Sequence, residues 1–274
     1  MDFFMTYIVP VLIVLGISAI FAFILAFLGE KLKVEVDPRI DKVRAHLPGI
    51  NCGGCGFASC DAYARALIEG KAKVGDCNPT PDDDRAVIAE LLHVEALKVQ
   101  RKVAAVYCAG TMGEASKGIY HGHEDCTSEN IIAGGVSFCE QGCLGGGTCV
   151  QACNYGALSM DEKRGVPVVD EDVCIACGAC TQACPKKLIG LIPVSAKAHV
   201  ACSCKSGGKQ AIEQCTTSCS SCGLCAKNCP VKAIKVEGNL ARIDYGKCNG
   251  CSLCATKCPR KCIVAREYGT DNRD

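Results

Sequence analysis

The sequence predicts an α+β fold class, in which an N-terminal transmembrane helix precedes a small cysteine-rich domain and two tandem cysteine-rich units. Three observations lead to this prediction: a long uncharged N-terminal segment, short helical and alternating patterns between glycine-rich loops, and a cysteine pattern that recurs in the second half. Cysteine accounts for 26 of the 274 residues, a density typical of a disulfide scaffold or of a protein rich in metal. Tryptophan is absent and aromatic residues make up only 5%, so we expect a thin apolar core.

The N-terminal segment has the length and composition of a membrane span. Residues 3–29 carry no charge, and Ser18 is the only polar side chain within residues 8–28. A helix of about 20 apolar residues crosses a bilayer, whereas the apolar region of a cleaved signal peptide is shorter and follows a basic residue. We therefore predict that residues 1–29 form a transmembrane anchor and contact the lipid bilayer.

The charges around this segment predict its orientation. Asp2 lies before it, and five basic residues follow it closely: Lys31, Lys33, Arg39, Lys42 and Arg44. By the positive-inside rule, a single pass through the cell (inner) membrane leaves the rest of the chain on the cytoplasmic side. Disulfides are rare in that reducing compartment, so the cysteines are expected to bind metal.

Residues 30–80 are predicted to form a membrane-proximal domain with one complete set of four thiolates. Cys52, Cys55 and Cys60 lie in a glycine-rich loop, and a short helix over residues 62–69 returns the chain to Cys77. This set suits one iron-sulfur cluster, and a structural zinc site is the alternative because zinc also accepts four thiolates.

A connecting helix and linker are predicted over residues 81–101. Thr80 is expected to cap the helix and Pro81 to occupy its first position, before three aspartates that favour the positive end of the helix dipole. The predicted buried face of this helix comprises Val87, Ile88, Leu91 and Leu92. An apolar run over residues 103–107 then predicts a strand.

The remaining residues form two similar units, 102–197 and 198–274. The pattern Cys-x2-Cys-x2-Cys-x3-Cys-Pro begins at Cys174, Cys219 and Cys248. In bacterial ferredoxins, the first three thiolates of such a run bind one 4Fe-4S cluster and the fourth binds its neighbour. Alternating apolar residues and turn residues between the paired runs predict short hairpins, so each unit is similar to a two-cluster bacterial ferredoxin.

This crossover rule assigns four ligands to each of four clusters, in addition to the cluster of the membrane-proximal domain. The predicted sets are Cys139, Cys143, Cys149 and Cys184; Cys174, Cys177, Cys180 and Cys153; Cys219, Cys222, Cys225 and Cys258; and Cys248, Cys251, Cys254 and Cys229. The total is five clusters and twenty ligands.

The run from Cys139 to Cys153 departs from the pattern, because its spacing is irregular and Asn154 replaces the proline. This run could hold a cluster of unusual potential. Six cysteines remain unassigned: Cys108, Cys126, Cys202, Cys204, Cys215 and Cys262. Buried free thiols are common in proteins, but the echo of the Cys108/Cys126 pair in Cys202/Cys215 leaves a sixth metal site or a redox pair as an alternative.

Other functions find no support in the sequence. The chain has no Walker A sequence, no G-x-G-x-x-G after a strand and no acid-base or nucleophile-base constellation. We therefore expect no catalytic residue, no flavin or NAD site and no nucleic-acid partner. Residues 186–266 contain 14 Lys and Arg against three acids, although the whole chain nets only +1. Part of this charge offsets the negative clusters, and an exposed excess would attract an acidic partner.

The anchor, the segment LPGINCGGCGFASCDAYARAL and the later cysteine runs, in this order, resemble the B subunit of the Rnf complex, in its extended polyferredoxin form. This resemblance implies an electron-transfer subunit of an ion-translocating ferredoxin:NAD oxidoreductase, which accepts electrons from soluble reduced ferredoxin and passes them to the other, membrane subunits. Translocation of Na+ or H+ and reduction of NAD would occur on those subunits. The alternatives are a polyferredoxin subunit of another membrane hydrogenase or dehydrogenase, and a non-redox metal-binding scaffold.

Overall fold

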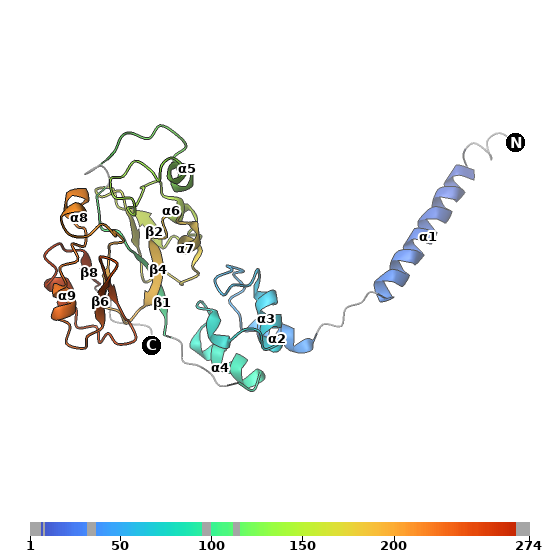
Figure 1. Ribbon diagram of the computed structural model, residues 1–274. Coiled ribbons are helices and arrows are strands. Elements are labelled where there is room, and N and C mark those ends of the chain that lie inside the picture. The colour runs from blue at the N-terminus through green and yellow to red at the C-terminus, as the bar shows by residue number, and fades with distance from the viewer. Residues whose placement is uncertain (1–6, 8, 32–36, 95–99, 112–115, 267–274) are drawn as a thin grey trace. The chain divides into compact units, whose positions relative to one another are not determined.

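The computed structural model describes residues 7, 9–31, 37–94, 100–111 and 116–266. The chain divides into two compact parts, residues 1–42 and 43–274 (Figure 1). In the first part, helix α1 (Val9–Lys31) is one continuous apolar helix. Its segment Leu12–Gly29 is long and apolar enough to cross a membrane, and none of it is buried against the protein. The predicted N-terminal apolar helix is therefore confirmed. Helix α2 (Pro38–Ala45) follows it.

The membrane-proximal segment contains three helices packed around a small core. These are α3 (Cys60–Ile68), the 3₁₀ helix η2 (Val74–Asp76) and α4 (Asp82–Leu91). The ring of Tyr63 is fully buried, and its hydroxyl donates a hydrogen bond to the carbonyl oxygen of Lys73, at 2.6 Å. This bond fixes the loop between α3 and η2, which is the loop that leads to Cys77.

The start and the buried face of α4 differ in detail from the prediction. Pro81, not Thr80, occupies the N-cap position, and no side chain caps the helix. Val87 is exposed, while Arg85, Ile88 and Ala89 are buried. The difference arises because Arg85 turns inward to donate hydrogen bonds to the carbonyl oxygens of Cys77 and Asn78, an interaction that hydrophobic periodicity does not reveal.

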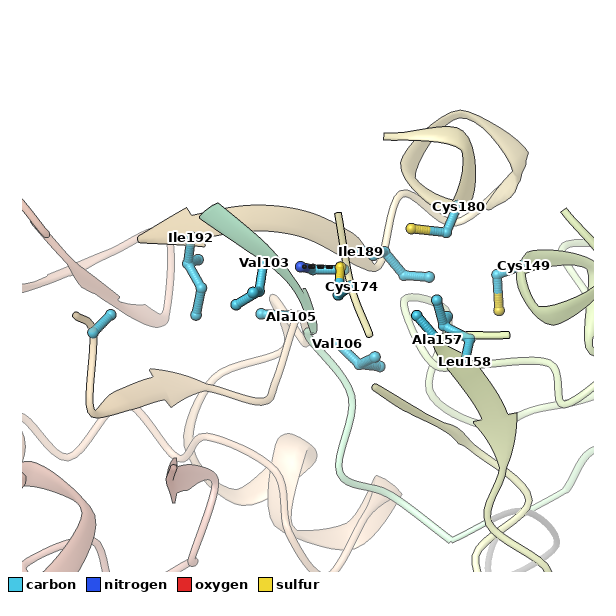
Figure 2. Close-up of a cluster of buried hydrophobic side chains, with 12 residues drawn as sticks. Val103, Ala105, Val106, Cys149, Ala157, Leu158, Cys174, Cys180, Ile189 and Ile192 are labelled. Carbon is cyan, nitrogen blue, oxygen red and sulfur yellow. Dashed lines mark hydrogen bonds between the residues drawn. The ribbon is translucent and has the colours of Figure 1, made fainter. Parts of the chain in front are cut away.

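The described residues of the first cysteine-rich unit include two antiparallel strand pairs. Strand β1 (Lys102–Val106) pairs with β4 (Ile189–Pro193), and β2 (Leu158–Met160) forms a hairpin with β3 (Pro167–Val169). Helices α5 (Cys126–Ile131), α6 (Thr148–Gln151) and α7 (Ala179–Ala183) complete the unit. Figure 2 shows that Val103, Ile189 and Ile192 share their core with cysteine side chains from α6, α7 and the loop before α7.

The second unit repeats this arrangement. Strand β5 (Ala198–Val200) pairs with β8 (Ile263–Ala265), and β6 (Ile234–Glu237) forms a hairpin with β7 (Leu240–Ile243). Its helices are α8 (Gly208–Gln214), α9 (Leu224–Lys227) and α10 (Leu253–Thr256). Gly238 and Asn239 both have positive φ, which suits the tight turn of a two-residue hairpin. The predicted α+β fold with repeated units is confirmed, whereas the proposed division into five domains by residue range stays a prediction.

The two units pack directly against each other. The amide of Ala109 donates a hydrogen bond to the carbonyl oxygen of Ala201, at 2.9 Å, and the hydroxyl of Ser203 donates to the carbonyl oxygen of Tyr107. Arg266 is buried between the units, where its guanidinium binds the carboxylate of Glu171. The first two bonds hold the loop after β1 against the loop after β5, and the Arg266–Glu171 pair joins the segment after β8 to the segment after β3.

Candidate iron-sulfur centres

In the second unit, two groups of four cysteines each surround a small apolar cavity. The first group is Cys219, Cys222, Cys225 and Cys258, and the second is Cys229, Cys248, Cys251 and Cys254. In each group, three cysteines of one run meet the last cysteine of the other run. This is the arrangement that the crossover rule predicts for two neighbouring 4Fe-4S clusters.

A left-handed residue turns the chain between the second and third cysteine of each regular run. Gly178, Gly223 and Ser252 have φ values of +80°, +72° and +56°, and each precedes a short helix that begins with the following residue. Glycine adopts this conformation without strain, which explains its presence at two of the three positions. The turn allows successive thiols to face the same cavity.

Backbone amides point at several of the predicted ligand sulfurs. The donors and acceptors are Ala233 N–H to Cys229 Sγ at 3.3 Å, Leu188 N–H to Cys184 Sγ at 3.4 Å, Ala104 N–H to Cys174 Sγ at 3.4 Å, and Gly250 N–H to Cys248 Sγ at 3.5 Å. The dashed line in Figure 2 marks the bond to Cys174. Such donors stabilise a thiolate and tune the potential of a bound cluster, so these positions fit the cofactor.

The predicted set Cys153, Cys174, Cys177 and Cys180 also comes together, in the core of the first unit. The pKa of the Cys180 thiol is raised to about 12, first by burial and then by the charges of Cys174, Cys177 and Cys153. Four crowded thiolates repel one another unless a cation lies between them. An iron-sulfur core supplies that positive charge and reverses the local preference for the neutral thiol.

The remaining set in this unit comes together only in part. Cys143, Cys149 and Cys184 surround a cavity of about 20 Å³, and the fourth cysteine that lines it is Cys126. Cys139, the remaining member of the predicted set, lines a different and larger cavity. Cys126 is one of the six unassigned cysteines, because it lies outside every run. It is buried at the start of α5, where the carboxylate of Asp125 caps the helix.

The membrane-proximal set is organised by α3 and the loops around it. Cys60 is the first residue of α3, and its amide donates to the side-chain oxygen of Asn51, at 2.8 Å. Arg85 holds the carbonyl oxygen of Cys77, at 2.9 Å. The pKa of the Cys77 thiol is raised, first by burial and to a smaller degree by the charges of Cys55 and Cys52. Cys52 and Cys55 therefore lie close enough to Cys77 for their charges to act on it.

Two of the unassigned cysteines lie against predicted ligands of the second unit. Cys262 Sγ is 3.5 Å from Cys258 Sγ. Cys202 Sγ accepts a hydrogen bond from the amide of Cys219, at 3.3 Å. Cys262 therefore also lines the cavity of the Cys219 group, as a fifth cysteine beside the predicted four. Cys202 contacts the same group through the amide of Cys219.

Comparison with protein families agrees with these groups. The Fe-S cluster family matches residues 47–79, the 4Fe-4S dicluster domain matches residues 139–188, and the 4Fe-4S binding domain matches residues 216–235 and 241–264. The first match favours iron-sulfur over zinc at the membrane-proximal group. The fold and the sites together define a protein that carries several 4Fe-4S clusters behind an N-terminal apolar helix.

Three relatives cover most of the chain and identify its family. The B subunit of the Na(+)-translocating ferredoxin:NAD(+) oxidoreductase complex of Acetobacterium woodii is 42% identical, over 94% of this chain and 79% of the relative. The B subunit of the proton-translocating ferredoxin:NAD(+) oxidoreductase complex of Clostridium ljungdahlii is 41% identical, over 88% and 85%. The B subunit of the ion-translocating oxidoreductase complex of Methanosarcina acetivorans is 38% identical, over 85% and 88%.

The chain belongs to the family of Rnf complex B subunits. It is an iron-sulfur electron-transfer subunit of an ion-translocating ferredoxin:NAD oxidoreductase, and it is associated with the membrane. The predicted class is confirmed, and both alternatives, a subunit of another membrane enzyme and a non-redox scaffold, are set aside.

Proposed function

We propose that this subunit accepts electrons from soluble reduced ferredoxin at its second cysteine-rich unit and delivers them to membrane subunits through the Cys52–Cys77 cluster. The observation that carries this proposal is the exposure of the cysteines. Cys222 and Cys251 are exposed, and both belong to the second unit. Every other cysteine of the chain is buried or half-buried. A ligand at the surface brings its cluster within reach of a soluble donor.

The second unit, which contains these two cysteines, carries an excess of exposed basic side chains. Its exposed lysines include Lys227, Lys232, Lys235, Lys257 and Lys261. Arg260 differs from them, because it is half-buried and donates a hydrogen bond to the carbonyl oxygen of Cys215, at 2.7 Å. The exposed lysines are therefore the candidates for attracting an acidic ferredoxin, and Arg260 is not.

Charge reversal tests this docking surface. The double variant Lys257→Glu/Lys261→Glu is expected to lower the second-order rate of ferredoxin oxidation about tenfold at low salt, because steering of an acidic partner is lost. The rate should also become less sensitive to ionic strength. Stopped-flow measurements over a salt series on the purified complex check both effects. Lys163→Glu, at an exposed position in the first unit, is the matched control. A double variant with the wild-type rate and salt slope would place the donor elsewhere.

The proposed path leaves the ferredoxin-like units near Cys177. A Cβ atom added to Gly54 would overlap the carbonyl oxygen of Cys177, so the loop between Cys52 and Cys55 lies directly on the loop between Cys174 and Cys180. Tyr155 is close to both loops, since the charges of Cys177 and Cys52 follow burial in raising the pKa of its phenol. The contact supports direct transfer between these two clusters.

Gly54→Ala is a test of this contact. Gly54 has no positive φ, so the methyl group acts through its clash with Cys177 and not through backbone strain. We expect slower electron transfer from the ferredoxin-like clusters to the Cys52–Cys77 cluster, with the iron content unchanged. Freeze-quench EPR of the complex after mixing with reduced ferredoxin measures this step. Ala58→Ser, an exposed change in the same loop, should leave the rate unaltered, and an equal rate for Gly54→Ala would disprove the route.

The cysteine runs of this relay supply ligands for five 4Fe-4S clusters, one in the Cys52–Cys77 set and four in the ferredoxin-like units, and the proposal puts all five on the cytoplasmic side of the membrane. In the set of Cys143, Cys149 and Cys184, the crossover rule favours Cys139 as the remaining ligand, whereas the cavity favours Cys126. The decisive experiment is anaerobic purification of the complex, followed by iron and sulfide analysis and an assay of ferredoxin-dependent NAD reduction. Protease accessibility in inverted vesicles tests the sidedness. The relative named for Na+ translocation is 42% identical to this chain and the relative named for proton translocation is 41% identical, so sequence identity favours neither ion.

A further inference from the structure

A cavity of about 380 Å³ lies between the two ferredoxin-like units, in contact with the loops after β1 and β5. A water molecule occupies about 30 Å³ in the liquid, so a single ion or water would leave most of this space unfilled. Four cysteines outside the regular runs line the cavity together with two cysteines of the irregular run: Cys108, Cys202, Cys204 and Cys215, with Cys139 and Cys143. The five predicted clusters use only Cys139 and Cys143 of these six thiols.

The thiols come from both units and approach one another in pairs. A Cβ atom added to Gly110 would lie 3.4 Å from Cys215 Sγ and 3.8 Å from Cys108 Sγ, so these two sulfurs flank the same small residue. The thiols of Cys139 and Cys204 are joined by a hydrogen bond. Each pair therefore combines a cysteine of the first unit with a cysteine of the second.

The surroundings suit a negatively charged cluster. The amides of Gly110 and Cys143 donate to Cys108 Sγ, as backbone amides do at the regular cysteine groups. The half-buried guanidinium of Arg260 binds the carbonyl oxygen of Cys215, and its Nε has no hydrogen-bond partner. A cation fixed beside a ligand offsets the charge of a cubane with four thiolates, which is roughly −2 in its oxidised form.

Cys202 and Cys143 also line this cavity, but each of them contacts another cluster group. Cys202 Sγ accepts the amide of Cys219 and so packs against the next cluster group. Cys143 faces the smaller cavity with Cys126, Cys149 and Cys184, which is a complete set of four without Cys139. This leaves Cys108, Cys139, Cys204 and Cys215 for the larger cavity.

We infer that Cys108, Cys139, Cys204 and Cys215 bind a sixth 4Fe-4S cluster that bridges the two units, and that Cys126 completes the cluster of Cys143, Cys149 and Cys184. Among the described residues, no group of His, Cys, Asp or Glu has the close spacing of a single-ion site. The same is true of the regular ferredoxin groups, so wider thiol spacing is a common feature of these four cysteines and of those groups. On assembly, each thiol releases a proton and forms an iron–sulfur bond.

The position of this cluster gives it a role in the relay, which rests on the proposed function. Cys204 lies near Cys219, a ligand of the second unit, and Cys108 lies near Cys143, a ligand of the first. One electron from the reduced cluster at Cys219 would reduce the bridging cluster and oxidise its donor. The bridging cluster would then reduce the cluster at Cys143 and return to its oxidised form.

Metal analysis of the anaerobically purified full chain tests the inference. We expect about 24 iron and 24 sulfide atoms per chain, because each cubane contains four of each. Cys108→Ala and Cys215→Ala should each lower both values by about four, and Cys126→Ala should do the same. Cys202→Ala, at the edge of the same cavity, is the matched control and should leave about 24.

Several results would overturn the sixth site. These are about 20 iron atoms in the wild-type chain, an unchanged iron content in Cys108→Ala and Cys215→Ala, zinc in place of iron, or a disulfide between the two cysteines found by thiol titration of the denatured chain. Failure of the proposed function looks different, because a chain with six clusters that ferredoxin does not reduce would retain the iron count and lose only the electron transfer.

Discussion

Removal of iron from the purified chain is expected to abolish the cooperative thermal unfolding of residues 43–274. Within the described residues of the two ferredoxin-like units, the strands have three to five residues and form four separate two-stranded sheets, while α6, α7, α9 and α10 have only four or five residues. Isolated hairpins and single helical turns are unstable in water, so these elements need further stabilisation.

The cysteines make up much of the core that would stabilise these short elements. Cys149, Cys174 and Cys180 belong to the buried cluster of the first unit, and Cys219 and Cys225 belong to that of the second. When these side chains bind clusters, the free energy of metal binding becomes free energy of folding, as in other small metal-dependent domains. Without the clusters, the same positions leave buried thiols and few large apolar contacts.

The unfolding is measured by circular dichroism during heating in detergent, with and without iron. Iron is removed with an oxidant and a chelator under anaerobic conditions, and the thiols are then reduced again before the measurement. The helical signal of α1 should persist, because its hydrogen bonds lie within the helix and detergent covers its apolar surface. The chelator alone, without the oxidant, is the control and should preserve the transition. An iron-free chain that unfolds cooperatively at the original midpoint would show that the apolar contacts suffice.

Elements fixed by neighbouring residues could be predicted from the sequence. The hairpins β2–β3 and β6–β7 follow from alternating apolar residues around Gly165 and around the Gly238-Asn239 turn, and both turns have the expected positive φ. The convergence of the Cys219 and Cys248 runs also follows from spacing, because the crossover pattern is a property of the local ferredoxin motif.

Features that depend on contacts between distant segments could not be predicted in this way. Cys108, Cys139, Cys204 and Cys215 share a cavity only because the two units pack against each other, and no local spacing encodes that packing. Arg260 counts as one more positive charge in the sequence, yet in the structure it is half-buried against Cys215. Charge counts give the net charge of a segment, whereas burial decides which charges a partner can reach.

Replacement of Cys55 by alanine is expected to stop electron transfer to the membrane subunits while the ferredoxin-like clusters remain reducible. Cys55 lies in the loop that also contains Cys52 and Gly54, and the Gly54 contact brings this loop onto the Cys177 loop. Loss of one of the four ligands should destabilise this cluster or change its potential. The other clusters use different cysteines in units that pack among themselves, so their assembly should continue.

The readout is NAD reduction by the whole complex, combined with EPR of the subunit after addition of reduced ferredoxin. We expect the NAD reduction rate to fall by at least about a hundredfold, since outer-shell changes at metal sites already cost 10–100-fold and this change removes a ligand. Cys251→Ala supplies the complementary case, because Cys251 is exposed in the second unit and its loss should impair reduction by ferredoxin itself. If the Cys55→Ala complex still reduced NAD at the wild-type rate, electrons would leave the subunit by another route, and the membrane-proximal cluster would have a structural role.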